Sequence, residues 1–277
     1  MTDDGKLRDT AEAVKGIVEA VPVYQDVVQP AAKQIGQALE TVAKTIHIAL
    51  APISALVWGY EQIKDFVLKN VAEKLKDVPN KNIITPNPNV AGPALEALRY
   101  TGHQEQLREM YANLLATSLD SETARNAHPS FVDIIRNMSP DEAKIIRLFA
   151  TRRSYPVIDL HAQVKDHPGY RIVVSNFSDI GPNAGCEHAK LCPGYLNNLC
   201  RLGLLDIPSG VFLTAPGTYE PLENSPELEA QKDYILKNLQ GSISFEHKMV
   251  AITDFGKQFV NSCVIEKGTS LRNLMTG

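Results

Sequence analysis

The segment from Leu107 to Phe149 constrains the fold of this chain more than any other, because it predicts three short amphipathic helices in succession. In its first part the apolar residues recur at the spacing of one helical face: Leu107, Met110, Tyr111, Leu114 and Leu115. Asp120 and Ser121 break this pattern, and a second helix is predicted after His128-Pro129-Ser130. The segment therefore indicates packed helices rather than a sheet.

The third predicted helix begins at Ser139-Pro140-Asp141-Glu142. Ser139 suits the N-cap, proline suits the first helical position, and Glu142 completes a capping box, in which two side chains bind the free backbone N–H groups.

Composition bounds the class of protein. A chain of 277 residues has room for about two domains. The formal net charge of −4 provides no general attraction to nucleic acid. Four cysteines, a polar start without a secretory signal and the absence of a long apolar run together predict a cytoplasmic protein without a conventional membrane span.

Breaks in the helical pattern predict five regions. Four prolines and several asparagines mark a linker between the helical parts. The predicted regions are an N-terminal helical region (1–78), a Pro-rich linker (79–92), a central helical region (93–138), a winged-helix-like module (139–265) and a tail (266–277). The fold class is thus mainly α, an N-terminal helical bundle followed by a C-terminal winged-helix-like α+β module.

The winged-helix prediction depends on the order of elements after residue 139. We expect helices over 139–150 and 156–164, a strand over 170–177, and a helix over 193–202 that ends at Gly203. A strand–turn–strand over 204–213, a helix over 226–239, a strand over 243–253 and a last helix capped by Thr253 follow. An insertion over 215–241 interrupts the hairpin, which in a winged-helix domain is usually a compact wing.

An apolar stretch, Ile46 to Tyr60, is the first candidate for function. It is too short to span a bilayer alone, but it suits the membrane interface or a partner. A buried bundle helix, apolar all round, is the alternative that we favour. The candidate contact residues are Ile46, Ile48, Leu50, Ile53, Leu56, Val57, Trp58 and Tyr60.

The predicted recognition helix is the second candidate. Asparagine can read adenine and arginine can read guanine, so the side chains of Tyr195, Asn197, Asn198 and Arg201 form the alternative nucleic-acid contact. One arginine provides little positive charge for binding nucleic acid, since phosphate binding usually needs several cationic residues. We therefore favour protein contact or dimerisation for this module.

Two further groups of residues are weaker candidates for a functional site. The spacing of Cys186, His188, Cys192 and Cys200 is not that of a zinc knuckle, so we assign no metal and no cofactor. Acidic and histidine residues around the first two helices lack a nucleophile–base pair, so we assign no catalytic residue and no small-molecule substrate. These residues are His103, Glu105, Glu109, His128 and Asp133.

Four motifs together resemble the Abi-alpha family, also described as a domain of unknown function. They are APISALVWGYEQIKDFV (51–67), NPNVAGPALEALRYT (87–101), LREMYANLLATSLD with HPSFVDIIRNMSPDEAKII (107–146), and ITDFGKQFV (252–260). The resemblance implies a bacterial protein of abortive infection, a defence against phage, and supplies no catalytic residues. We expect a non-enzymatic protein that binds a protein partner or itself, with the membrane surface and nucleic acid as further candidate targets, and a peripheral membrane location on activation if the apolar stretch acts there.

Overall fold

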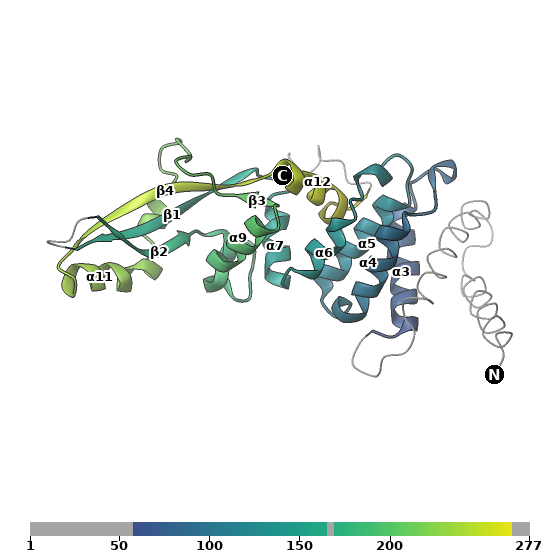
Figure 1. Cartoon of the computed structure of the whole chain (residues 1–277), viewed down its shortest axis with the longest axis horizontal. Coiled ribbons are helices and arrows are strands. Elements are labelled where there is room, and N and C mark those ends of the chain that lie inside the picture. The colour runs from purple at the N-terminus through teal and green to yellow at the C-terminus, as the bar shows by residue number, and fades with distance from the viewer. Residues whose placement is uncertain (1–57, 165–168, 268–277) are drawn as a thin grey trace. The chain divides into compact units, whose positions relative to one another are not determined.

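The computed structural model describes residues 58–164 and 169–267, and within them the chain forms two compact units (Figure 1). Unit 1 contains residues 58–137 and 262–267. Unit 2 contains the described residues of 138–261. Most of the predicted N-terminal region, including residues 46–57 of the apolar stretch, lies outside the described residues.

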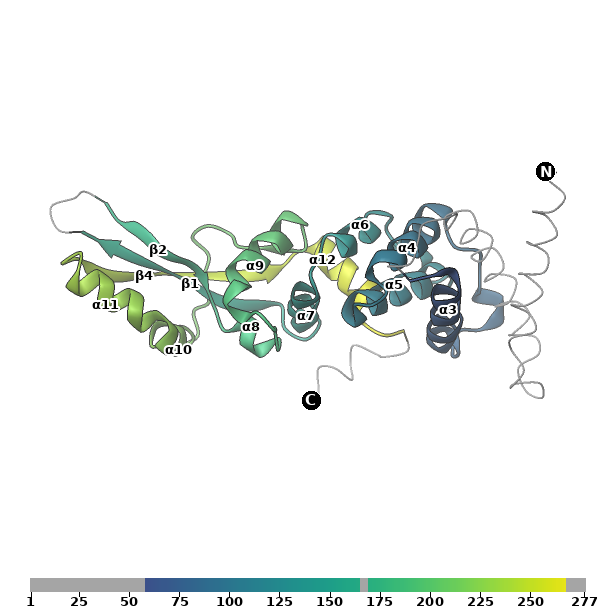
Figure 2. The same cartoon turned by 90° about the horizontal axis from the view of Figure 1, so that it is seen from below.

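Unit 1 is helical. Helices α3, α4 and α5 pack against one another, and α6 packs on α4 and α5 (Figures 1 and 2). Their apolar faces form a core in which the side chains of Tyr111 and Phe131 are fully buried. The elements are α3 (Tyr60–Leu75), η1 (Asn80–Asn82), α4 (Pro88–Thr101), α5 (Glu105–Ser118), η2 (Ala124–Asn126) and α6 (Ser130–Arg136).

The segment 262–267 completes unit 1 after the chain has passed through unit 2. Asn113 Nδ2 on α5 donates to the carbonyl of Cys263 at 2.9 Å, and Thr117 Oγ1 donates to that of Ser262 at 3.1 Å. Lys267 Nζ lies 2.8 Å from Asp120 Oδ2. These bonds place residues 262–265 in unit 1, although the sequence assigned them to the winged-helix-like module.

Unit 2 combines helices with one sheet. The capping box that the sequence predicted at Ser139 is present: Glu142 N donates to Ser139 Oγ, and Ser139 N donates to Glu142 Oε2. The elements are α7 (Pro140–Leu148), β1 (Ser154–Gln163), β2 (Arg171–Phe177), α8 (Ile180–Asn183), η3 (Ala189–Leu191), α9 (Cys192–Arg201), β3 (Leu205–Asp206), α10 (Glu220–Glu223), η4 (Pro226–Leu228), α11 (Glu229–Lys237), β4 (Ser242–Ile252), α12 (Asp254–Phe259) and the π-helical turn η5 (Val260–Val264), whose last residues belong to unit 1.

The sheet is antiparallel, with strand order β2-β1-β4-β3. Strands β1 and β4 pair over their full length, from Ser154 opposite Ala251 to Gln163 opposite Ser242. Helix α11 lies along this ribbon (Figure 2). The chain as described is therefore an α+β protein, and none of its described helices combines the length and hydropathy that crossing a membrane requires.

Three sequence expectations were wrong in detail. Residues 156–164 were expected to be helical but lie largely in β1. The expected hairpin over 204–213 reduces to the short strand Leu205–Asp206. Helix α4 begins at Pro88, inside the predicted linker and five residues before Pro93, because the Asn87 side chain accepts a hydrogen bond from Asn89 N and caps the helix.

Candidate functional site

The two faces of the sheet differ in chemistry. Ile158, Leu160 and Ala162 of β1 are buried on the apolar face, where residues of α10 and α11 cover them. The alternate β1 residues, Asp159 and His161, lie on the opposite face, because successive strand residues point to opposite sides. Their register partners on β4 are Glu246 and Ser244. We call this second side the polar face.

A hydrogen-bonded group holds Asp159 in place. Lys248 Nζ lies 2.6 Å from Asp159 Oδ1 and 2.6 Å from Asn176 Oδ1. The Asn176 backbone N–H donates to the same Asp159 oxygen at 2.7 Å, which its left-handed backbone (φ 55°) allows. Asp159 is only 4% exposed, so these partners compensate a charge that would be costly to bury alone.

His161 is the unusual member of the polar face. It is 5% exposed, and its ring stacks on the exposed ring of Tyr170, with centroids 4.1 Å apart. Its Nε2 is buried and has no hydrogen-bond partner among the described residues. Glu246 Oε2 lies 3.5 Å away, near enough for an ion pair if the imidazole is protonated. A buried nitrogen without a hydrogen-bond partner lowers the free energy of unfolding by about 1–3 kcal/mol, so His161 Nε2 is an atom at which a bound ligand would be favourable.

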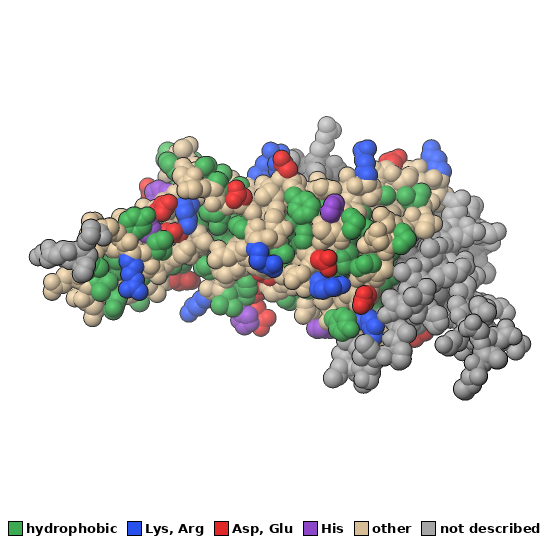
Figure 3. Space-filling model, in the orientation of Figure 1, with side chains coloured by type: hydrophobic (Ala, Val, Ile, Leu, Met, Phe, Trp, Pro, Cys, Tyr) green, Lys and Arg blue, Asp and Glu red, His purple; other side chains and the backbone are tan. Residues whose placement is uncertain are grey.

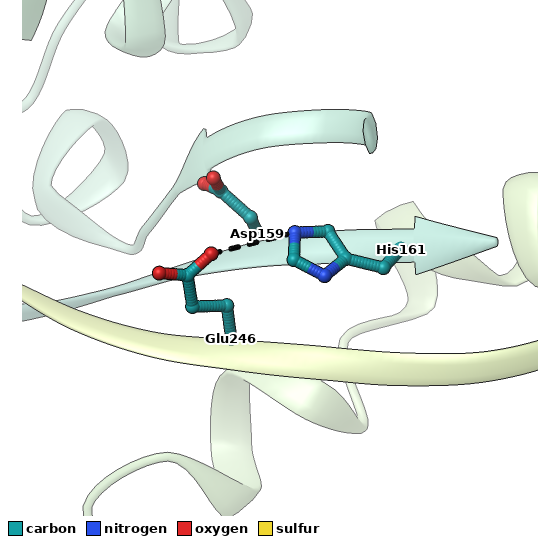
Figure 4. Close-up of side chains that lie close together, drawn as sticks. All are labelled: Asp159, His161 and Glu246. Atoms are coloured by element: carbon teal, nitrogen blue, oxygen red, sulfur yellow. Dashed lines mark ion pairs between the residues drawn. The ribbon is translucent and has the colours of Figure 1, made fainter. Parts of the chain in front are cut away.

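Figure 4 shows the Asp159 and Glu246 carboxylates beside the Nε2 side of the His161 ring. The ligand atoms of the three residues all lie within 4.8 Å of one another, and among the described residues this is the group that could hold a metal ion. Figure 3 shows acidic, histidine and basic side chains close together over this part of the ribbon.

Sequence reasoning missed this group for a physical reason. Asp159 and His161 share a face only in a strand, and the segment was expected to be a helix, where residues two apart diverge. The signal was nonetheless present, since Ile158 to Gln163 alternates strictly between apolar and polar residues. Glu246 could not be added without the β1–β4 register.

The predicted nucleic-acid residues on α9 all have partners inside unit 2. Tyr195 Oη donates to Asp141 Oδ2 at 3.3 Å, and Asn198 Nδ2 donates to Glu142 Oε1 at 2.7 Å. Asn197 Oδ1 accepts from Asn176, while Arg201 Nε and Nη2 both donate to Asn198 Oδ1. Base reading by these side chains would have to replace the bonds that hold α9 to α7 and β2.

Asp141 is the centre of the contacts between α7 and the loop before α9. Its carboxylate accepts from the backbone N–H of Glu187 and of His188, each at 2.9 Å, and from Lys144 Nζ at 3.0 Å. Burial works to raise the pKa of this carboxyl, but the His188 and Glu187 N–H groups and the Lys144 ammonium outweigh it and lower the pKa to about 2.

The lowered pKa of Asp141 predicts a specific acid response. A carboxyl whose pKa is lower in the folded than in the unfolded chain stabilises the fold above its unfolded value, about 3.9, and this contribution is lost as the pH falls toward the folded value. We expect the difference in thermal midpoint between the native chain and Asp141→Asn to shrink steadily below about pH 4. For Asp254→Asn the difference should stay small throughout. An unchanged Asp141→Asn difference down to pH 2 would contradict the assignment.

Trp58 is the one member of the predicted membrane or partner contact whose side chain the structure describes. Its ring meets Phe66 edge-on, with centroids 5.5 Å apart, and the Arg108 guanidinium lies 5.7 Å from its centroid. It also contacts Gly102, where any Cβ would overlap the indole. The indole is thus half-buried within unit 1, and the prediction for residues 46–57 stays a prediction.

None of the other candidate residues belongs to the group that could hold a metal ion among the described residues. Burial raises the pKa of Cys186 and of Cys200 to about 11, which keeps both thiols protonated. Glu109 lies 3.2 Å from Lys74, and Asp133 lies 3.6 Å from Arg136. The ring nitrogen Nδ1 of His128 accepts from Ser130 N at the start of α6, as expected for a residue that orders a loop.

Comparison with known proteins gives one family. No curated protein matches the chain. A solved structure of an uncharacterized protein from the hydrocarbon-degrading marine bacterium Alcanivorax borkumensis SK2 is 18% identical, with a TM-score of 0.34 over 57% of this chain and 96% of the other. Residues 59–263 match the family described as abortive infection alpha, and this span is most of the chain. The chain therefore belongs to the abortive infection alpha family.

Proposed function

We propose that this chain is a non-catalytic component of bacterial phage defence that binds another protein through the polar face of unit 2. Membership of the abortive infection alpha family supports the defence role. The observation that supports protein binding is a pair of exposed apolar side chains, Tyr170 and Ile172, on the polar face. Tyr170 is 62% exposed and Ile172 is 49% exposed.

Tyr170 and Ile172 belong to one surface. Tyr170 stacks on His161, and Ile172 is opposite His161 in the β1–β2 register, so both lie on the polar face. Strand β2 is the edge of the sheet, with β1 as its neighbour among the described strands. An extended partner segment can add to such an edge through backbone hydrogen bonds while its side chains cover Tyr170 and Ile172.

We further propose that unit 2 is a winged-helix module used for protein contact. The order α7, β1, α8, α9, β3, β4 and the pairing β1-β4-β3 support this, with β2 and the α10–α11 segment as additions. Protein contact is favoured over nucleic acid because the polar side chains of α9 are engaged within the unit. The sheet edge, by contrast, leaves apolar side chains exposed.

The test is a phage challenge of cells that express the native chain or the double variant Tyr170→Ser/Ile172→Ser. We expect the variant to lose protection while its thermal midpoint stays close to that of the native chain. The matched control is Tyr234→Ser/Leu236→Ser on α11, which removes an equally exposed aromatic and aliphatic pair, 54% and 52% exposed, away from the polar face. This control should still protect.

Other outcomes assign the function elsewhere. Full protection by Tyr170→Ser/Ile172→Ser, or equal loss in both double variants, would reject the polar face as the contact surface. Protection accompanied by entry of a membrane-impermeant dye would favour the segment from Ile46 to Tyr60. A salt-dependent mobility shift that a combined Asn197, Asn198 and Arg201 substitution abolishes would favour nucleic acid. Failure of the native chain to protect would remove the defence role itself.

A further inference from the structure

We propose that Asp159, His161 and Glu246 bind a divalent transition-metal ion, with Zn²⁺ as the best match. This site goes beyond the partner contact proposed above and does not depend on it. One imidazole and two carboxylates form a donor set that zinc accepts, and three protein ligands leave one position for water or for a group of a bound molecule.

The buried imidazole is the observation that separates this group from an ordinary acidic cluster. His161 Nε2 is buried, lacks a hydrogen-bond partner in the described part of the chain and lies next to the two carboxylates. A neutral imidazole offers a lone pair at this atom, and a metal ion would use it. The two carboxylates would then balance the charge of the ion in a setting where His161 is 5% exposed and Asp159 is 4% exposed.

The geometry needs one ligand to move inward by about 1 Å. Ligand atoms around a tetrahedral zinc ion, at bond lengths of about 2.0–2.2 Å, lie about 3.3–3.6 Å apart. The three ligand atoms here lie within 4.8 Å of one another. The Glu246 side chain is 43% exposed, so it is the ligand with freedom to move inward.

The residues around the site hold one ligand in place. Lys248 Nζ and the Asn176 N–H both bind Asp159 Oδ1, and neither of these bonds uses Oδ2. A metal-bound carboxylate is commonly fixed in this way by hydrogen bonds to its other oxygen. The Lys248 ammonium also offsets one of the two acidic charges of Asp159 and Glu246.

The experiment is a calorimetric titration of the full chain with Zn²⁺ after removal of metal by a chelator. We expect one equivalent to bind, and His161→Gln and Glu246→Gln each to weaken binding by about 100-fold or more, since loss of even a supporting neighbour costs about 10–100-fold. The control is His247→Gln, which alters the other described histidine–glutamate pair of β4, with Glu223, on the apolar face. It should bind as the native chain does.

Titration with Co²⁺ identifies the donors. Oxygen and nitrogen ligands give a visible d–d spectrum without the intense thiolate charge-transfer band that Cys186, Cys192 or Cys200 would add. A band of that kind, binding that His161→Gln and Glu246→Gln leave unchanged, or no heat of binding in the native chain would each overturn the proposal. Because Glu246 is partly exposed, Glu246→Gln gives a folded variant even if the loss of His161 disturbs the sheet.

Discussion

Replacement of Asp141 by alanine should lower the free energy of unfolding of unit 2 by about 3 kcal/mol, since it removes the one charged acceptor that several part-buried donors share. The Glu187 and His188 N–H groups, the Lys144 ammonium and the Tyr195 hydroxyl all donate to this one carboxylate. Denaturant unfolding followed by circular dichroism measures the loss. We also expect faster amide exchange at Glu187 and His188, because the loop before α9 loses its anchor.

The matched control for this prediction is Asp254→Ala. Asp254 also lies in the first turn of a helix and also pairs with a lysine three residues on, with Lys257 Nζ at 2.7 Å. Its side chain is 97% exposed and binds no buried loop, so its removal should change stability far less. Similar losses for Asp141→Ala and Asp254→Ala would show that the loop contacts contribute little.

Gly256→Ala should also be strongly destabilising, by about 3 kcal/mol, because there is no space for a methyl group at this position. A Cβ on Gly256 would overlap the carbonyl oxygen of Leu204 and approach Ile252 Cγ1 to 2.8 Å. The Leu204 oxygen is fixed, since Thr253 N donates to it at 3.0 Å. The measurement is again the free energy of unfolding, and part of the loss should appear as weakened docking of α12 onto β3.

Gly194→Ala on α9 is the control for Gly256→Ala. Both glycines are helical, but a Cβ at Gly194 meets nothing within 4 Å. Alanine there should be neutral or stabilising by about 0.5–1 kcal/mol, the usual preference of a helix for alanine over glycine. If both substitutions cost the same, the close approach of Leu204 to Gly256 would not be the cause.

The sequence predicted local structure where a few neighbouring residues decide it. The capping box of Ser139 and Glu142 is present as expected, and Thr253 Oγ1 accepts from Gly256 N to cap α12. These features depend on residues three apart, so their spacing can be read directly. The helical faces of α5 and α6 also follow the apolar pattern from Leu107 to Ile135.

Features that depend on pairing between distant residues could not be predicted. Residues 156–164 were expected to form a helix, yet every residue of β1 pairs with β4 and the segment is a strand. The same error hid Asp159 and His161 as residues of one face. Glu246 is separated from them by most of unit 2, so no spacing rule joins the three. The return of Ser262 to unit 1 depends on Thr117 and Asn126, which are 145 and 136 residues away in the sequence.

That return has a consequence for the order in which the protein is made. A ribosome that has added Asn261 has delivered every described residue of unit 2, but it has not yet delivered the segment that Asn113, Thr117 and Asp120 bind. The described residues of unit 2 are therefore all synthesised before unit 1 can fold completely. Premature termination near residue 261 would leave the described part of unit 2 joined to a helical unit in which Asn113 and Thr117 lack the carbonyl groups of Cys263 and Ser262 as acceptors.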